Sequence, residues 1–254
     1  MKRVFSSCAI AFSTYSRIPM PQVEWNDDNM RYALAFFPLV GVAVGAAFWG
    51  ADALCRLLET GAILRGALLT AVPAAITGGI HLDGYCDTVD ALSSHAPREK
   101  KLAILKDSNA GAFAVIWCGI WFLLYFALLT ELQNAATAAA GFVLSRSLSA
   151  WAVERLPVAR AGMGADLKQG SRFPRWALGG YLALFGGAVW LWGVPAAGAA
   201  ALAAAVCFYF FYKQMALRLF GGFTGDLAGW FLQVCELLLL AAVVVTERVI
   251  AVWF

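Results

Sequence analysis

Long apolar runs, separated by short polar stretches, repeat along the whole chain. Each run is about 18 to 22 residues long, the length of an α-helix that crosses the hydrocarbon core of a bilayer. Seven spans are predicted, at residues 33–51, 62–80, 111–130, 135–153, 176–193, 196–212 and 227–246. The pattern predicts an all-α, polytopic membrane helix bundle in which residues 1–254 form a single integral membrane domain.

A few ionisable residues interrupt the predicted spans. Arg65 lies near one end of the second span, Arg146 lies in the fourth and Glu236 in the seventh. Charged groups inside a membrane are costly and are usually paired or functional. For Arg146 and Glu236 an internal ion pair and a contact with a substrate both remain open.

The opening stretch, residues 1–21, reads "MKRVFSSCAIAFSTYSRIPMP". It has a basic tip and a short apolar part, but no small-residue cleavage site follows, and Arg17 and two prolines interrupt it. We interpret it as a retained interfacial or re-entrant segment rather than a removable signal.

Lysines and arginines are divided unequally between the two sets of loops. With the N-terminus in the cytoplasm, the outer segments hold only Arg56 and Arg248, with Arg65 close by, and the inner segments hold most of the others. Positive residues favour the cytoplasmic side of a membrane. Residues 81–110, 154–175 and 213–226 are therefore expected on the cytoplasmic face.

Composition supports a membrane protein. Hydrophobic residues make up 61% of the chain and charged residues 14%, and the mean hydropathy is +0.72; soluble domains carry about 25% charged residues. A net charge of +3 is too small to indicate a nucleic-acid partner. The six cysteines show no zinc spacing, so we expect reduced thiols.

Three aspartates lie in one short stretch, "HLDGYCDTVDAL" (81–92). On a helix, Asp83, Asp87 and Asp90 would fall within roughly 60° of one another. Like charges so close repel one another, and a divalent cation would relieve the repulsion. Oxygen ligands without thiolates suit Mg²⁺ or Mn²⁺ better than zinc. The alternative is a loop whose acids only face water, but ionisable groups at a membrane edge are usually functional.

Further polar residues fall on the same predicted face. The stretch "KDSNAG" (106–111) supplies Lys106 and Asp107, "GGFTGD" (221–226) supplies Gly225 and Asp226, and "YSRIPMP" (15–21) supplies Arg17. Glycines let backbone N–H groups approach a phosphate, although they also pack membrane helices. Arg17 is either a phosphate contact or a membrane-surface anchor, and His81 is either a substrate contact or a hydrogen-bonded histidine at the edge of a span. Together, acids, glycines and basic side chains suit phosphoryl or nucleotidyl transfer at a membrane surface.

The chain resembles the cobalamin synthase family, the adenosylcobinamide-GDP ribazoletransferases. The resemblance rests on "SRIPMP" (16–21), "HLDGYCDTVDAL" (81–92), "KDSNAGAF" (106–113), "LSRSLSAW" (144–151) and "GGFTGD" (221–226), with Glu236 following. The pattern H-L-D-G-x-x-D-x-x-D followed by K-D-S-x-x-G is specific. Departures are small: Ser16 stands where the family usually has Thr, Ala91 where it usually has Gly, and "LAGW" follows Asp226 where Thr-Leu-Gly-Ala is common. None of them removes an acid.

The resemblance implies a Mg²⁺-dependent transferase of the bacterial cytoplasmic (inner) membrane, with its active-site loops facing the cytoplasm. The hydroxyl of α-ribazole, or of its 5′-phosphate, would attack the corrinoid-side phosphorus of adenosylcobinamide-GDP. GMP would leave, and adenosylcobalamin or its 5′-phosphate would form. The expected partners are these substrates and the lipid bilayer, and a complex with other late corrinoid enzymes would be one reason for the membrane location.

The resemblance also implies roles for individual residues. Asp83, Asp87, Asp90 and Asp107 are expected to be catalytic and to hold one or two Mg²⁺ ions, unless Asp90 or Asp107 takes the proton from the hydroxyl instead. The expected substrate-binding residues are Arg17, His81, Lys106, Arg146, Gly225, Asp226 and Glu236.

Two other protein classes compete with this interpretation. A CDP-alcohol phosphatidyltransferase performs the same kind of chemistry, but its signature has Ala-Arg after the Asp-Gly pair, and none follows Asp83 and Gly84 at that spacing. A cation channel or transporter would use acids as an ion path, but here the acids cluster on one face rather than at the bilayer midplane.

Overall fold

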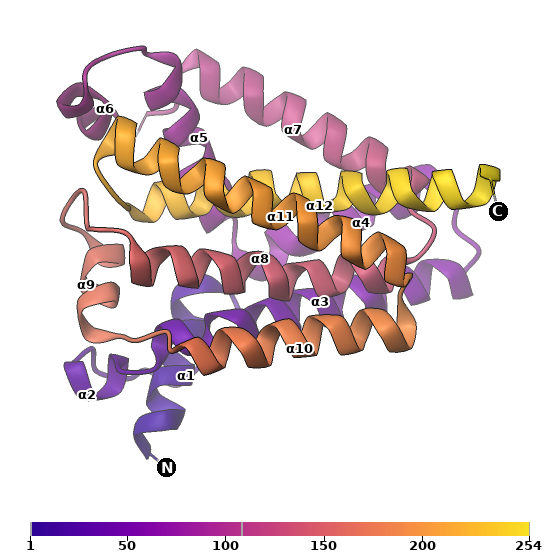
Figure 1. Ribbon diagram of the computed structural model, residues 1–254, viewed down its shortest axis with the longest axis horizontal. Helices are drawn as coiled ribbons and strands as arrows, with labels where there is room; N and C mark the ends of the chain where they lie inside the picture. The colour runs from indigo at the N-terminus through magenta and orange to yellow at the C-terminus, as the bar shows by residue number, and fades with distance from the viewer. Residues whose placement is uncertain (1, 108, 254) are drawn as a thin grey trace.

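The computed structural model describes residues 2–107 and 109–253, and these residues fold almost entirely into helices (Figure 1). The helices are α1 (Lys2–Tyr15), α2 (Asp27–Met30), α3 (Ala33–Leu57), α4 (Ala62–Thr77), α5 (Ile80–Ser93), α6 (Arg98–Ile104), α7 (Ala112–Glu131), α8 (Ala135–Arg155), α9 (Met163–Gly170), α10 (Arg175–Trp192), α11 (Pro195–Met215), a π-helical turn (Ala216–Phe220) and α12 (Gly225–Trp253). The described residues contain no strand, only one isolated parallel bridge between Val158 and Phe223. The all-α class is therefore confirmed.

Each of the seven predicted spans coincides with a helix. Within the described residues, four helical segments are long and apolar enough to cross a membrane alone: α3, α7, α12, and α11 with its π-helical extension (195–220). The pair α4 and α5 qualifies only when taken together. A polytopic membrane bundle is thus supported, while the count of seven spans stays a prediction.

The second predicted span ends earlier than expected. The helix α4 ends at Thr77, and Gly78 and Gly79 follow with φ angles of 68° and 80°, which glycine adopts without strain. The next helix, α5, is bent by 94° from α4. Figure 1 shows α5 and α6 near the end of the bundle that also holds α9 and the start of α12. We therefore treat α5 as lying outside the membrane-spanning segments.

The N-terminal helix α1 fits the predicted interfacial segment. It has 14 residues, fewer than the roughly 20 that a membrane crossing needs. It packs against α3, and its apolar residues Val4 and Phe5 remain exposed. Such a helix can lie at a membrane surface with its exposed apolar side chains in the lipid.

The helix α8 forms the centre of the bundle and packs against α3, α10, α11 and α12. Asn134 caps its start by accepting a hydrogen bond from the Ala136 N–H at 2.9 Å. Gly45 of α3 faces this helix, and a Cβ at that position would lie 2.5 Å from the Ala139 carbonyl oxygen. A small residue is therefore needed for the two backbones to touch, as is common between membrane helices.

At the end of the bundle opposite α5, buried carboxylates connect the helices through ion pairs and hydrogen bonds. The buried Asp52 carboxylate accepts hydrogen bonds from Arg56 at 2.8 Å and from Arg65 at 2.5 Å. Glu247 of α12 accepts two backbone hydrogen bonds, from the N–H groups of Gln133 and Asn134. These contacts join α3, α4, the α7–α8 turn and α12, and they give Arg65 a structural partner.

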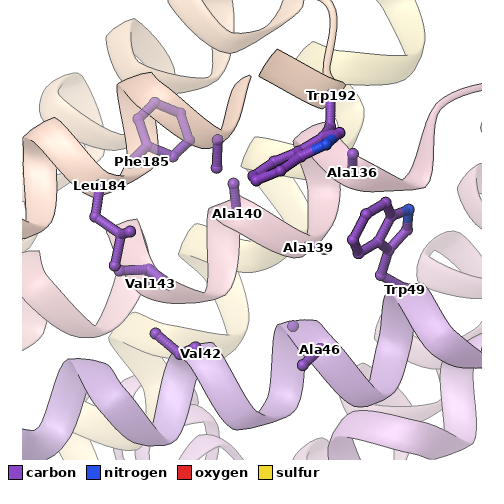
Figure 2. Close-up of a pocket in the computed structure, with 12 residues that line it drawn as sticks. Val42, Ala46, Trp49, Ala136, Ala139, Ala140, Val143, Leu184, Phe185 and Trp192 are labelled. Atoms are coloured by element: carbon purple, nitrogen blue, oxygen red, sulfur yellow. The ribbon is translucent and has the colours of Figure 1, made fainter. Parts of the chain in front are cut away.

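An apolar groove of about 210 Å³ lies between α3, α8 and α10. Figure 2 shows α8 between α3 and α10, with Trp49 and Trp192 at one end of the groove. The ring centroids of these two tryptophans are 6.0 Å apart. All of its lining side chains are apolar. The groove therefore offers no group for chemistry, and the polar end of the bundle is the place to look for a site.

Two glycines let α5 and α12 meet at that polar end. A Cβ on Gly84 would lie 2.9 Å from the Asp226 Cα and carbonyl oxygen, and a Cβ on Gly229 would lie 3.0 Å from the His81 carbonyl oxygen. Side chains at these positions would push the helices apart. The contact fixes the distance between the aspartates of α5 and the first turn of α12.

We predict that Gly84→Ala lowers the free energy of unfolding by about 1–3 kcal/mol, the usual cost of overpacking. Thermal unfolding in detergent would measure the loss. The matched control is Gly119→Ala in α7, where a Cβ would meet nothing within 4 Å. Equal unfolding temperatures for the two variants would contradict the proposed close contact.

Candidate active site

The glycine-rich stretch 221–226 forms a fixed turn rather than a loose loop. Gly221 and Gly222 have φ angles of 77° and 153°, which favour glycine. The Phe223 N–H donates to the Pro157 carbonyl at 2.8 Å, and the Ala159 N–H donates to the Phe223 carbonyl at 2.9 Å. The Thr224 hydroxyl then accepts from the Leu227 N–H and caps α12. Asp226 is thereby placed in the first turn of α12.

The three aspartates of the stretch 81–92 lie on α5, as predicted, and Asp226 joins them from α12. Burial raises the pKa of Asp87 to about 7, with further contributions from the charges of Asp83, Asp226 and Asp90. Asp83, Asp226 and Asp90 therefore lie close enough to Asp87 for their charges to act on its carboxyl group. The structure therefore brings together residues that lie more than a hundred positions apart in the sequence.

Two arginines that were not among the predicted site residues flank the glycine-rich turn. Arg160 forms an ion pair with Asp226 at 3.2 Å, and both side chains are about one-fifth exposed. The Arg98 guanidinium occupies the space that a side chain on Gly221 would need. No local sequence pattern marks either arginine, because the bridge between Val158 and Phe223 and the position of α6 are tertiary features.

Asp90 has a structural partner that sequence reasoning missed. Its carboxylate accepts from the Gly111 N–H at 2.6 Å and from the Ala114 N–H at 2.8 Å, at the start of α7. The positive end of a helix favours such a carboxylate. A Cβ on Gly111 would lie 2.8 Å from the Asp90 oxygens, so glycine is needed there. This contact joins the motif at residues 81–92 to the motif at residues 106–113.

Lys106 and Asp107 are exposed on the loop between α6 and α7. The Asp107 carboxylate accepts hydrogen bonds from the Asn109 backbone and side chain, which lower the Asp107 pKa. Ser108, within the same motif, lies outside the described residues. The loop is anchored to the acidic cluster through Gly111, but Asp107 itself does not contribute to the raised pKa of Asp87.

Arg17 lies against the bend between α4 and α5. Its backbone N–H donates to the Ile76 carbonyl at 2.7 Å, and its side chain fills the space beside Gly78. The residue as a whole is exposed. Both predicted roles of Arg17, a phosphate contact and a membrane-surface anchor, are compatible with this position.

Arg146 and Glu236 form an internal ion pair between α8 and α12. Their side chains are 1% and 5% exposed, and the closest nitrogen and oxygen are 2.6 Å apart. The Ser145 hydroxyl donates to the same Glu236 oxygen at 3.0 Å. The sequence left two roles open for these residues, an internal ion pair and a contact with a substrate, and the structure shows the ion pair. Neither residue lines the polar cavity at the end of the bundle that holds α5.

That polar cavity has a volume of about 250 Å³ and lies beside the acidic cluster. Asp83, Gly84, Gly225 and Asp226 line it on one side, and Tyr15, Phe37 and His81 line it on another. His81 is buried and packs against the rings of Tyr15 and Phe37. The cavity is therefore the candidate active site, because it is the place where acids, glycines of the turn and a histidine meet.

A preformed cage for a metal ion is absent from the described part of the chain: no three His, Cys, Asp or Glu side chains there converge on one point. The donor set is nevertheless a hard one, since carboxylates dominate it. Mg²⁺ usually keeps several waters and is held by one or two carboxylates together with substrate phosphates, rather than by a cage made of protein alone. The arrangement therefore fits a site that is completed by a phosphate-containing substrate.

The fold and the site define a helical membrane protein with a carboxylate-rich cavity at one end of its bundle. Comparison with known proteins identifies it further: the chain belongs to the cobalamin-5-phosphate synthase family, whose sequence profile matches residues 7–244. It is thus a transferase of cobalamin biosynthesis. No solved structure matches the chain significantly.

Two similar curated proteins are both named adenosylcobinamide-GDP ribazoletransferase. The protein from Lachnoclostridium phytofermentans is 43% identical over 249 residues, which cover 96% of this chain and 95% of that protein. The protein from Desulfitobacterium hafniense is 36% identical over 241 residues, covering 91% and 93%. The resemblance stated from the sequence is confirmed, and it outweighs the lipid-transferase and ion-channel alternatives.

We predict that Asp90→Ala destabilises the protein by about 1–2 kcal/mol, because the two N–H groups at the start of α7 lose their acceptor. Asp90→Asn retains one acceptor oxygen and should lose less. Thermal unfolding of both variants in detergent would compare them. An Ala variant as stable as the wild type would show that the helix-capping contact is not significant.

We predict that Arg146→Ala destabilises the protein by about 3–5 kcal/mol, because Glu236 would be left as an unpaired buried charge. Replacing both residues by methionine should restore much of the loss, since no buried charge then remains. A single variant that unfolds like the wild type but binds substrate weakly would instead support a role in substrate binding.

Proposed function

We propose that this chain is an adenosylcobinamide-GDP ribazoletransferase. It joins α-ribazole, or α-ribazole 5′-phosphate, to adenosylcobinamide-GDP with release of GMP, and gives adenosylcobalamin or its 5′-phosphate. The observation that carries the proposal is the cluster of Asp83, Asp87, Asp90 and Asp226, of which Asp83 and Asp226 line a cavity, in a chain of this family. Carboxylates for a metal, with arginines nearby, suit attack of a hydroxyl on a diphosphate.

The metal we propose is Mg²⁺. Asp87 and Asp226 would hold it together with diphosphate oxygens, because Asp90 is engaged by the start of α7 and Asp107 by Asn109. Bound there, Mg²⁺ would neutralise negative charge on the diphosphate and on the leaving GMP. Asp226 already has Arg160 as a partner, and that arginine would turn toward a phosphate oxygen when a metal takes its place.

Proton removal is assigned to Asp83. It lines the cavity and is exposed, and its carboxylate makes no hydrogen bond to the residues that the structure describes. Asp90 and Asp107 were expected from the sequence to hold metal, unless one of them takes the proton instead. Each accepts two hydrogen bonds that already engage its carboxylate. An unengaged carboxylate at the cavity edge suits a general base better.

The remaining basic residues suit the phosphate that does not react. The Arg98 side chain, from α6, lies against Gly221 of the glycine-rich turn, and the exposed Lys106 and Arg17 lie on segments next to α5. Arginine binds phosphate with a planar set of donors. These residues all belong to segments predicted to be cytoplasmic, so we place the reaction on the cytoplasmic side of the bacterial inner membrane.

We predict that Asp83→Asn reduces GMP release at least about 100-fold, the lower range for losing a general base. The amount of membrane-inserted protein should stay unchanged, because the Asp83 side chain packs against no other element through a hydrogen bond. The control is Asp27→Asn, at the exposed start of α2. Full turnover by the Asp83 variant would remove this residue from the mechanism.

A further inference from the structure

The cavity beside the acidic cluster has two different sides. Asp83 and Asp226 lie on one side, where the glycine-rich turn begins α12. The other side is apolar and aromatic, and includes Phe37, Leu34 and Leu232. Tyr15 and His81 stack with ring centroids 5.9 Å apart, and Phe37 meets the His81 ring edge at the same distance. The cavity thus provides a charged edge and a flat, aromatic interior.

One polar atom in this interior has no partner. His81 is 4% exposed, and its buried Nε2 atom makes no hydrogen bond to any residue in the described part of the chain. A buried polar atom without a partner costs free energy, and such atoms usually await a ligand or a water molecule. His81 lines the cavity, so a small rotation of its ring would bring the Nε2 atom to a ligand inside the cavity and supply the missing hydrogen bond.

Size and charge limit what can enter. Cavities of about 300–1,000 Å³ hold drug-sized ligands, so about 250 Å³ suits one small aromatic group with its sugar. A corrin macrocycle is too large. The diphosphate is excluded from the apolar interior, because its charges would lose their solvation there. Its place is the charged edge formed by Asp83 and Asp226, where Arg160 pairs with Asp226.

We infer that this cavity is the binding site for the flat aromatic base of the acceptor nucleoside, with the His81 Nε2 atom forming a hydrogen bond to that nucleoside. The inference rests on the proposed function and deepens it. The ribose hydroxyl would then point out to Asp83 at the cavity edge, and the corrinoid and the guanosine would remain outside. His81 is a binding residue for the acceptor only.

The test measures binding of each substrate separately, without Mg²⁺ and without turnover. Purified wild-type protein in detergent is titrated with α-ribazole, and in a second series with adenosylcobinamide-GDP. Ala228→Leu fills the cavity from α12, and His81→Ala removes the hydrogen bond. We expect a loss of α-ribazole affinity of at least tenfold for the first variant and about tenfold for the second. Affinity for adenosylcobinamide-GDP should stay within twofold of the wild type.

The chain provides matched controls. His95, the other of its two histidines, is exposed on the turn after α5, outside this cavity, so His95→Ala should leave both affinities unchanged. Ala203→Leu, on the exposed side of α11, controls for added bulk. In steady-state turnover, His81→Ala should raise the KM for the acceptor but not for the donor, a split that a general loss of structure would not produce.

Failure of the inference can be distinguished from failure of the proposed function. Unchanged α-ribazole affinity in both cavity variants, or a loss confined to the donor, would overturn the cavity assignment even if the wild type releases GMP. Conversely, selective loss of α-ribazole binding in these variants supports the assignment even if the wild type never releases GMP.

Discussion

The close approach of α5 to α12 is the contact on which the rest of the site depends. Gly84 and Gly229 leave no side chain between the two helices, so Asp226 lies beside the acids of α5. The bend after α4, made by two glycines with left-handed backbone angles, turns α5 across the end of the bundle. Without that turn the acids would point into the membrane, where unpaired charges are costly.

The charged residues of the chain fall into two groups with different physical roles. One group is paired within the protein: Arg146 with Glu236, and Asp52 with Arg65. The other group, at the end of the bundle that holds α5, consists of carboxylates that lie close together with few positive partners. Burial, together with the charges of the neighbouring carboxylates, raises the pKa of Asp87 there to about 7. Stability alone would not favour such crowding, whereas binding of a cation and a phosphate would resolve it.

Much of the fold and part of the candidate site could be predicted from the sequence. The length of the apolar runs predicts the helices, and the spacing of Asp83, Asp87 and Asp90 places them on one helical face, as α5 shows. Sequence could not predict that Asp90 caps α7, that Arg160 reaches Asp226, or which partner Arg146 has, because each depends on segments brought together by tertiary packing. The spacing of residues along the sequence predicts which side chains share a helix face, but it does not predict which other segment packs against that face.

The measurement that tests the account most directly is GMP release by the detergent-purified protein, supplied with adenosylcobinamide-GDP, α-ribazole 5′-phosphate and Mg²⁺. Mass spectrometry of the corrinoid product would accompany it. The account predicts one GMP for each corrinoid that gains the lower base, and no reaction when EDTA removes the metal. GMP release that EDTA does not affect would contradict the role given to the carboxylates. The absence of any joined product would contradict the proposed reaction itself.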